Sequence, residues 1–163
     1  MSTHSDLFFA FDLKPERFGQ IEEGLHYLMG TLDAIENPPL DSFFANDPEA
    51  SFFVTEEWRG LLVVSNNLMS SFPGATQSAL FSGFANNSPQ YETLRHTLTF
   101  RDEILLDSLH LYYFFLDWIA SYAETTGFIG YVHSQYNAYP SLLLFKDGRL
   151  ELHNTNLPQN GDG

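Results

Sequence analysis

The sequence contains no cysteine, and only seven of its 163 residues are lysine or arginine. Without cysteine the chain cannot form a disulfide, offer a thiolate nucleophile or build a zinc–thiolate site. The few basic residues stand against 21 acidic ones, which leaves a formal net charge of −14. Phosphate contacts depend on lysine and arginine. We therefore expect no direct binding to nucleic acid and no attraction to an anionic membrane.

The negative charge favours a partner of the opposite sign. A negative field speeds the encounter with a basic protein and makes the charges of the two surfaces complementary. A high net charge also keeps a protein in solution without any partner, so both interpretations stay open. We expect a basic protein partner, and the sequence leaves the oligomeric state undetermined.

Length and composition indicate one globular domain. Of the 163 residues, 44% are hydrophobic and 16% are aromatic, which is enough apolar material for a core. We assign residues 1–153 to a single domain and residues 154–163 to a flexible C-terminal tail. The long apolar stretch at residues 104–123 contains three polar ionisable residues and is too polar to span a membrane. The N-terminus has no basic, apolar leader pattern, so we expect a cytoplasmic protein.

Two segments have the apolar spacing of helices. In residues 15–36 apolar side chains recur every three or four positions, Pro15 suits a first helical turn, and the run 37–39 (Asn-Pro-Pro) ends the pattern. Residues 100–124 are mostly apolar or aromatic, and Gly127 follows them as a helix end. We expect the second helix to be the central one, with other elements around it.

Alternating apolar residues predict the strands. A short helix is expected at residues 75–84, and residues 91–100 fit a strand and a helix equally well. The last three strands form a meander whose final turn, at 147–148 (Asp-Gly), suits type I′. The expected order is that of an α+β domain, with a mainly antiparallel sheet and both helices packed on one face. The expected strands are residues 7–13, 51–55, 60–65, 128–133, 141–146 and 149–153.

One segment of the meander resembles thioredoxin-like proteins. Residues 139–148, YPSLLLFKDG, are similar to the segment of proline, hydrophobic residues and Phe-Lys-x-Gly in that family. The resemblance implies disulfide exchange, which a chain without cysteine cannot perform. We therefore interpret the segment as a buried strand that enters a tight hairpin turn.

Motifs for phosphate binding, serine nucleophiles and helical zinc sites are absent from the sequence. One polar set, Glu103, Asp107, His110 and Asp117, is spaced to share a helical face, where acid–base chemistry or a hard metal could use it. The carboxylate-x-x-His spacing occurs once, whereas di-iron bundles use it twice. We favour a solvent-exposed stripe, and we expect neither a metal nor another cofactor.

Aromatic and acidic residues meet in two expected turns. One turn joins the expected strands 51–55 and 60–65, and the other precedes residue 141. Exposed tyrosine and tryptophan beside acids are typical of interface hot spots. Tryptophan in the first turn could instead fold back onto the core. The expected partner-binding residues are Glu56, Glu57, Trp58, His133, Tyr136 and Tyr139.

Three functions are compatible with these patterns. The leading hypothesis is a non-catalytic acidic protein that binds and inhibits a basic toxin or enzyme, as bacterial immunity proteins do. The alternative is a small enzyme or ligand-binding domain whose pocket lies at the face of Asp107, His110 and Asp117. A third possibility is a subunit of an obligate assembly, with an apolar exposed patch around Phe114.

Overall fold

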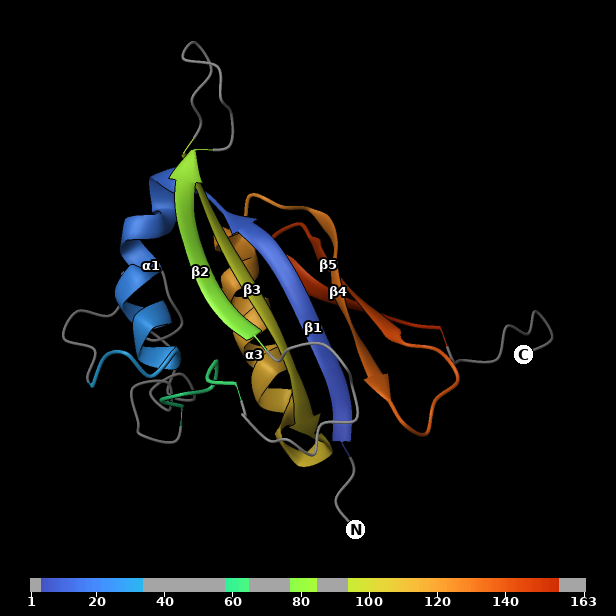
Figure 1. Cartoon of the computed structure of the whole chain (residues 1–163). Coiled ribbons are helices and arrows are strands. Elements are labelled where there is room, and N and C mark those ends of the chain that lie inside the picture. The colour runs from blue at the N-terminus through green and yellow to red at the C-terminus, as the bar shows by residue number, and fades with distance from the viewer. Residues whose placement is uncertain (1–3, 34–57, 65–76, 85–93, 156–163) are drawn as a thin grey trace.

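The computed structural model describes residues 4–33, 58–64, 77–84 and 94–155, and these form two α-helices and six strands (Figure 1). Short 3₁₀ turns at Leu106–Ser108 and Ala120–Tyr122 flank the second helix. The predicted α+β class is therefore confirmed. In chain order the elements are β1 His4–Leu13, α1 Pro15–Leu28, β2 Gln77–Phe84, β3 Leu94–Leu105, α3 Leu109–Ile119, β4 Gly127–Ser134, β5 Ser141–Lys146 and β6 Arg149–Asn154.

The six strands form one antiparallel sheet in the order β2-β3-β1-β4-β5-β6. β1 lies inside the sheet, where Phe9 pairs with Phe100 of β3 and with Gly130 of β4. The predicted C-terminal meander is confirmed as β4, β5 and β6. Its last turn has Asp147 at φ 52° and Gly148 at φ 73°, the two left-handed conformations that a type I′ turn requires.

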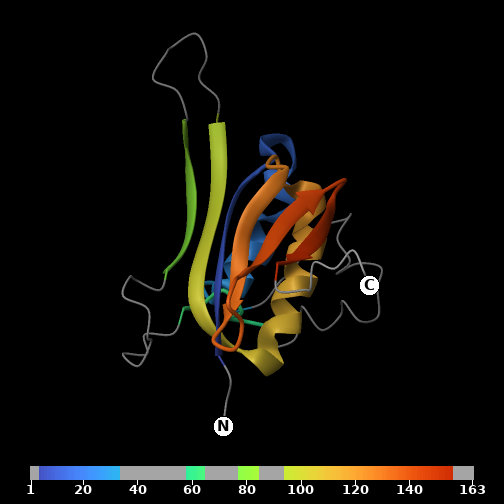
Figure 2. The same cartoon turned by 90° about the vertical axis from the view of Figure 1, so that its right-hand side faces the viewer.

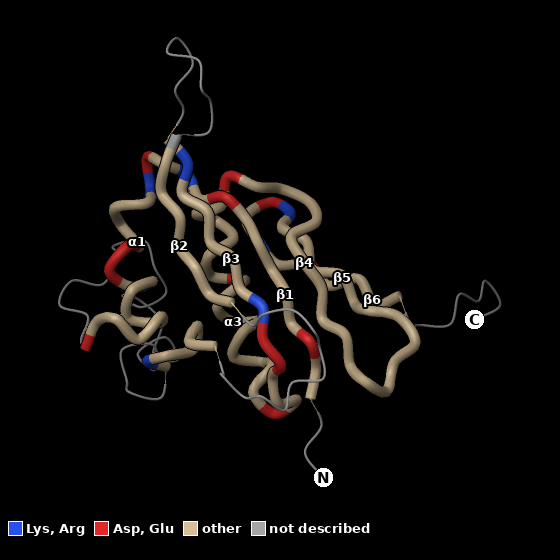
Figure 3. Tube along the Cα trace, in the orientation of Figure 1, with Lys and Arg blue, Asp and Glu red and all other residues tan. Residues whose placement is uncertain are grey.

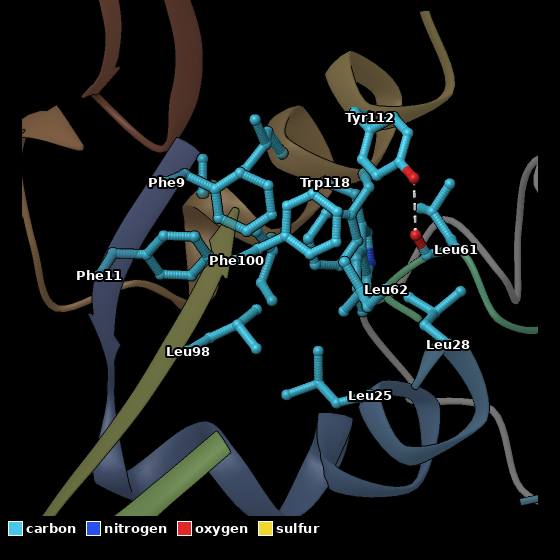
Figure 4. Close-up of a cluster of buried hydrophobic side chains, with 14 of the residues drawn as sticks. Phe9, Phe11, Leu25, Leu28, Leu61, Leu62, Leu98, Phe100, Tyr112 and Trp118 are labelled. Carbon is cyan, nitrogen blue, oxygen red and sulfur yellow. Dashed lines mark hydrogen bonds between the residues drawn. The ribbon is translucent and has the colours of Figure 1, made fainter. Parts of the chain in front are cut away.

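Both helices contact the same face of the sheet, and we call it the packed face. On this face Phe9 of β1 stacks against Phe100 of β3, with ring centroids 5.1 Å apart, and Phe115 of α3 lies 6.1 Å from Phe9. Phe18 of α1 stacks on the His96 ring of β3 at 3.7 Å. Figure 2 shows the sheet and the helices as two layers, and Figure 4 shows the apolar cluster between them.

The segment of residues 58–64 closes one end of this core. Leu62 is fully buried, and its amide donates to the carbonyl oxygen of Leu28 at the end of α1, at 2.8 Å. The Tyr112 hydroxyl of α3 donates to the carbonyl oxygen of Leu61, also at 2.8 Å (Figure 4). The segment is a series of turns, so the strand predicted at residues 60–65 is wrong for its described part. The strand predicted at 51–55 lies outside the described residues.

The second helix exists, but its predicted start at residue 100 is wrong. Residues 94–105 form β3, in which buried and partly exposed residues alternate, and α3 begins only at Leu109. The apolar run at 104–106 belongs both to the end of the strand and to the turn before the helix, so it hides the change of period. For residues 91–100, the strand interpretation is confirmed from Leu94 onward.

Two further boundaries differ from the prediction. Residues 77–84 form the edge strand β2 and not a short helix, because pairing with β3 outweighs the weak local pattern. The first helix ends at Leu28 and not at residue 36. Gly30 adopts φ 77°, and its amide donates to the carbonyl oxygen of Tyr27 at 3.0 Å, which ends the helix. None of the described helices is long and apolar enough to cross a membrane.

Candidate functional site

The connection between β4 and β5 carries two of the most exposed aromatic side chains in the described residues. Tyr136 is 67% exposed and Tyr139 is 63% exposed. Their predicted exposure is confirmed. Exposed tyrosine side chains, with an apolar ring and a polar hydroxyl, are typical of protein interfaces.

Hydrogen bonds hold the backbone of this connection in place. The amide of Asn137 donates to the carbonyl oxygen of Ser134 at 3.1 Å. His133 Nε2 lies 3.0 Å from the Asn137 carbonyl oxygen, which only accepts, so this ring nitrogen carries the hydrogen. The Thr155 hydroxyl, which follows β6, donates to the Pro140 carbonyl oxygen at 2.6 Å. His133 therefore supports the loop that presents the tyrosines.

Strand register places further exposed residues at the same end of the sheet. Ser5 of β1 pairs with Ile104 of β3 on one side and with Ser134 of β4 on the other. Neighbouring strands are about 4.8 Å apart, and β1 lies between β3 and β4. The backbones of β3 and β4 therefore end within about 10 Å of each other. Here β3 continues into exposed residues, and acidic segments of β1 and β3 lie nearby (Figure 3). We call this surface the tyrosine end: Leu105, Leu106, Asp107, Tyr136 and Tyr139.

The other predicted turn has a different outcome. Trp58 is only 7% exposed and belongs to the core, so its predicted exposure is wrong and the alternative, in which it folds back, is confirmed. An indole is large and apolar, and burial on the core gains more than a place at a turn. Glu56 and Glu57 lie outside the described residues. Whether these three residues bind a partner stays a prediction.

The polar set predicted to share one helical face is divided among different elements. Glu103 lies on β3, while Asp107 and His110 are exposed before and within α3. Asp117 is half-buried and accepts a hydrogen bond from Arg149 Nε at 3.0 Å, which raises the pKa of that guanidinium. It therefore ties the β5–β6 turn to α3. In the part of the chain that the structure describes, no three His, Asp or Glu residues are grouped to hold a metal ion.

The opposite face of the sheet, the open face, carries two carboxylate–arginine pairs, and no described helix lies on it (Figure 2). The carboxylate of Asp12 accepts a hydrogen bond from Arg95 Nε at 2.9 Å. The Asp6 side chain, only 5% exposed, lies 3.6 Å from Arg101 Nη2. The Tyr131 hydroxyl donates to the same Asp6 oxygen at 3.1 Å. Burial first, and then the charge and hydrogen bond of Asp6, raise the pKa of Tyr131.

Beside the Asp6 pair, the open face has a hollow of about 400 Å³. We call it the open-face hollow, and it is lined by Phe8, Gln77, Arg101 and Tyr131. The rings of Phe8 and Tyr131 lie 5.7 Å apart at 34°. The four residues come from β1, β2, β3 and β4. Sequence reasoning missed this site; the only available signal was polar residues at alternate positions of an apolar strand, such as Asp6 and Asp12.

A second hollow, of about 510 Å³, lies on the outer side of α1. Its acidic side chains give it a negative lining, and Glu22 lies 3.9 Å from His26 Nε2 within it. Its lining residues are Gly19, Glu22, Glu23, His26, Thr31 and Leu32.

The chain matches no protein-family model, no curated protein and no solved structure at a significant level. Its function is therefore argued from its own surface and charges.

Proposed function

We propose that this chain is a non-catalytic binding protein that captures a basic protein at the tyrosine end and inhibits it by covering its surface. The observation that carries the proposal is the pair Tyr136 and Tyr139, exposed on a hydrogen-bonded loop of a protein with a net charge of −14. Tyrosine is enriched at the centres of protein interfaces, where it contributes area and a hydroxyl.

The arginine side chains bind oxygen atoms of the protein itself, which supports a basic partner. Each of the five arginines contacts a carboxylate or carbonyl oxygen of the protein itself. Lys14 and Arg17, for example, both donate to the carbonyl oxygen of Ser121, at 3.2 Å and 3.0 Å. The acidic residues outnumber the basic ones, so an approaching protein meets a negative electrostatic field. Such a field favours cationic surfaces and raises their association rate.

The loop geometry supports binding with a small loss of conformational entropy. The hydrogen bonds of Ser134, Asn137 and Pro140 fix the backbone before any partner arrives. Ordering a loop on binding costs affinity, so a loop that is already ordered saves that cost. Leu105 and Leu106 are also exposed at this end of the sheet.

The most concrete form of the proposal is an immunity-type protein that acts in the cytoplasm against a basic toxin or enzyme. In the described part of the chain, nothing favours the alternative of a catalytic pocket at Asp107, His110 and Asp117. The first two are exposed, and the third is engaged with Arg149.

The test is capture from lysate of the native host, with the immobilised full chain at low salt. We expect wild-type protein to retain a cationic protein, and the double variant Tyr136→Ser/Tyr139→Ser to lose it. The retained protein should elute as salt rises, because screening weakens attraction between exposed charges. Isothermal titration with the purified partner then gives the affinity of each variant.

The matched control is Phe81→Ser, which removes another exposed aromatic residue from the far edge of the sheet. This variant should retain the partner like wild type. Capture of the same proteins by wild type and by the double tyrosine variant would contradict the proposal. So would a captured partner with a net negative charge.

A further inference from the structure

The described lining of the open-face hollow combines aromatic, amide and cationic groups. Phe8 and Tyr131 supply two aromatic rings, Gln77 supplies an amide, and Arg101 supplies a guanidinium that is 29% exposed. Among the described residues that line the hollow, Arg101 is the only charged one. A cation therefore faces this hollow, although the protein as a whole is strongly negative.

The nearby acid, Asp6, pairs with Arg101 but is not among the described residues that line the hollow. The Asp6 carboxylate is almost completely buried, and it is directed at the Arg101 guanidinium and the Tyr131 hydroxyl. It forms an ion pair with the guanidinium at 3.6 Å, and the Arg101 side chain stays 29% exposed. A basic side chain that entered the hollow would meet Arg101 first. The hollow is thus unsuited to the basic partner proposed above.

Size and shape limit the ligand. A volume of about 400 Å³ is at the small end of the range for ligand pockets. Phe8 and Tyr131 are tilted by 34° with centroids 5.7 Å apart, which leaves ring faces and edges for contact with a flat apolar group. Gln77 offers both a donor and an acceptor at the margin.

We propose that the open-face hollow binds a small planar carboxylate, with its ring against Phe8 and Tyr131 and its carboxylate on the Arg101 guanidinium. This site is separate from the tyrosine end, so it is independent of the proposed function. Planar guanidinium recognises carboxylate through paired hydrogen bonds, which sets both the charge and the orientation of the ligand.

The test uses three probes of the same shape and different charge: benzoate, benzamide and benzamidine. Each is titrated at millimolar concentrations into the full chain, and amide and aromatic NMR shifts are followed. We expect benzoate to shift the signals of Phe8, Gln77 and Tyr131 and to bind about tenfold more tightly than benzamide, a factor typical of one charged hydrogen bond. Benzamidine should bind most weakly of the three.

The decisive variant is Asp6→Asn/Arg101→Gln, which removes both charges together and leaves no unpaired buried carboxylate. It should bind benzoate and benzamide equally, because only the aromatic contacts remain. Tyr131→Phe keeps the ring and should retain the preference for benzoate. The amide NMR spectrum of each variant shows whether the sheet is intact.

Three results would overturn the proposal. The first is benzamidine binding as tightly as benzoate, which would mark the hollow as a site for a basic group. The second is a preference for benzoate that survives in the double variant. The third is the absence of shifts in the hollow with all three probes.

Discussion

The two faces of the sheet are built from the same strands and have opposite chemistry. On β1, Phe9 faces the helices and is fully buried, while its neighbour Phe8 lies on the open face beside a hollow. On β3, Phe100 is fully buried, and the next residue, Arg101, pairs with Asp6 on the open face. A two-residue period thus separates an apolar layer from a charged one.

This difference indicates that the packed face supplies most of the stability. Full burial of one large apolar side chain is worth about 1.5–3 kcal/mol, whereas an exposed ion pair contributes about 0–1 kcal/mol. The open face can therefore change its side chains at small cost. For that reason it is suited to recognition, and the packed face is not.

The largest effect is expected at Gly130 of β4, which pairs with Phe9 of β1 inside the sheet. A Cβ atom built there would lie 1.9 Å from the Phe8 carbonyl oxygen, which belongs to the backbone and cannot move aside. We expect Gly130→Ala to cost about 4 kcal/mol or more, the range of exceptional single substitutions. Urea unfolding measures it. In Gly83→Ala, where nothing lies within 4 Å of the new atom, the midpoint should hardly change.

The next largest effect compares phenylalanines on different parts of the sheet. Phe100→Ala removes a fully buried ring from the packed face and should destabilise the protein by about 3–5 kcal/mol. Phe81→Ala, at a ring 59% exposed on β2, should stay within about 0.5 kcal/mol. Thermal unfolding of both variants gives the comparison. Equal losses would show that the edge strand β2 contributes to stability as much as the packed face does.

The loss of stability at alkaline pH compares a tyrosine of the helix layer, Tyr112, with a tyrosine of the open face, Tyr131. Burial, above all, raises the pKa of Tyr112 on α3 and of Tyr131 on β4 above the usual 10.0. Each folded state therefore holds its proton more tightly than the unfolded chain does. Stability should be complete below pH 10 and fall as pH rises toward the folded pKa values.

Tyr112→Phe should flatten this alkaline loss, because the substituted ring cannot ionise. At neutral pH it should cost about 1 kcal/mol, since the Leu61 carbonyl oxygen loses its donor. Tyr131→Phe should reduce the alkaline loss of stability by a smaller amount, because the Tyr131 ring lies nearer to solvent. Urea unfolding at a series of pH values separates the two. An unchanged slope in Tyr112→Phe would exclude this residue as the cause.

The sequence was sufficient for features that depend on local pattern. Alternation and the turn Asp147-Gly148 predict the meander, and the spacing of apolar residues predicts both helices. The end of α1 was missed because it depends on Gly30, one of three glycines in that segment. The start of α3 was missed because strand and helix share one apolar run.

One candidate site follows from local sequence pattern, and the other depends on the pairing of distant strands. Exposure of Tyr136 and Tyr139 follows from their place in a polar turn between two strands. The open-face hollow could not be predicted, because Phe8, Gln77 and Arg101 meet only through the register of three strands. Register depends on the whole hydrophobic pattern of a sheet, and no local motif encodes it.

The smallest effects are expected from the charged pairs of the open face. Arg95 is half exposed, and its partner Asp12 is 21% exposed, so Arg95→Ala should cost about 0.5 kcal/mol and less at high salt. Arg101→Ala should cost more, about 1–3 kcal/mol, because it removes the ion-pair partner of the nearly buried Asp6 carboxylate, which keeps the hydrogen bond from the Tyr131 hydroxyl. Urea unfolding at low and high salt tests both variants. A loss from either one as large as that of Phe100→Ala would show that charges, and not only apolar contacts, hold this sheet together.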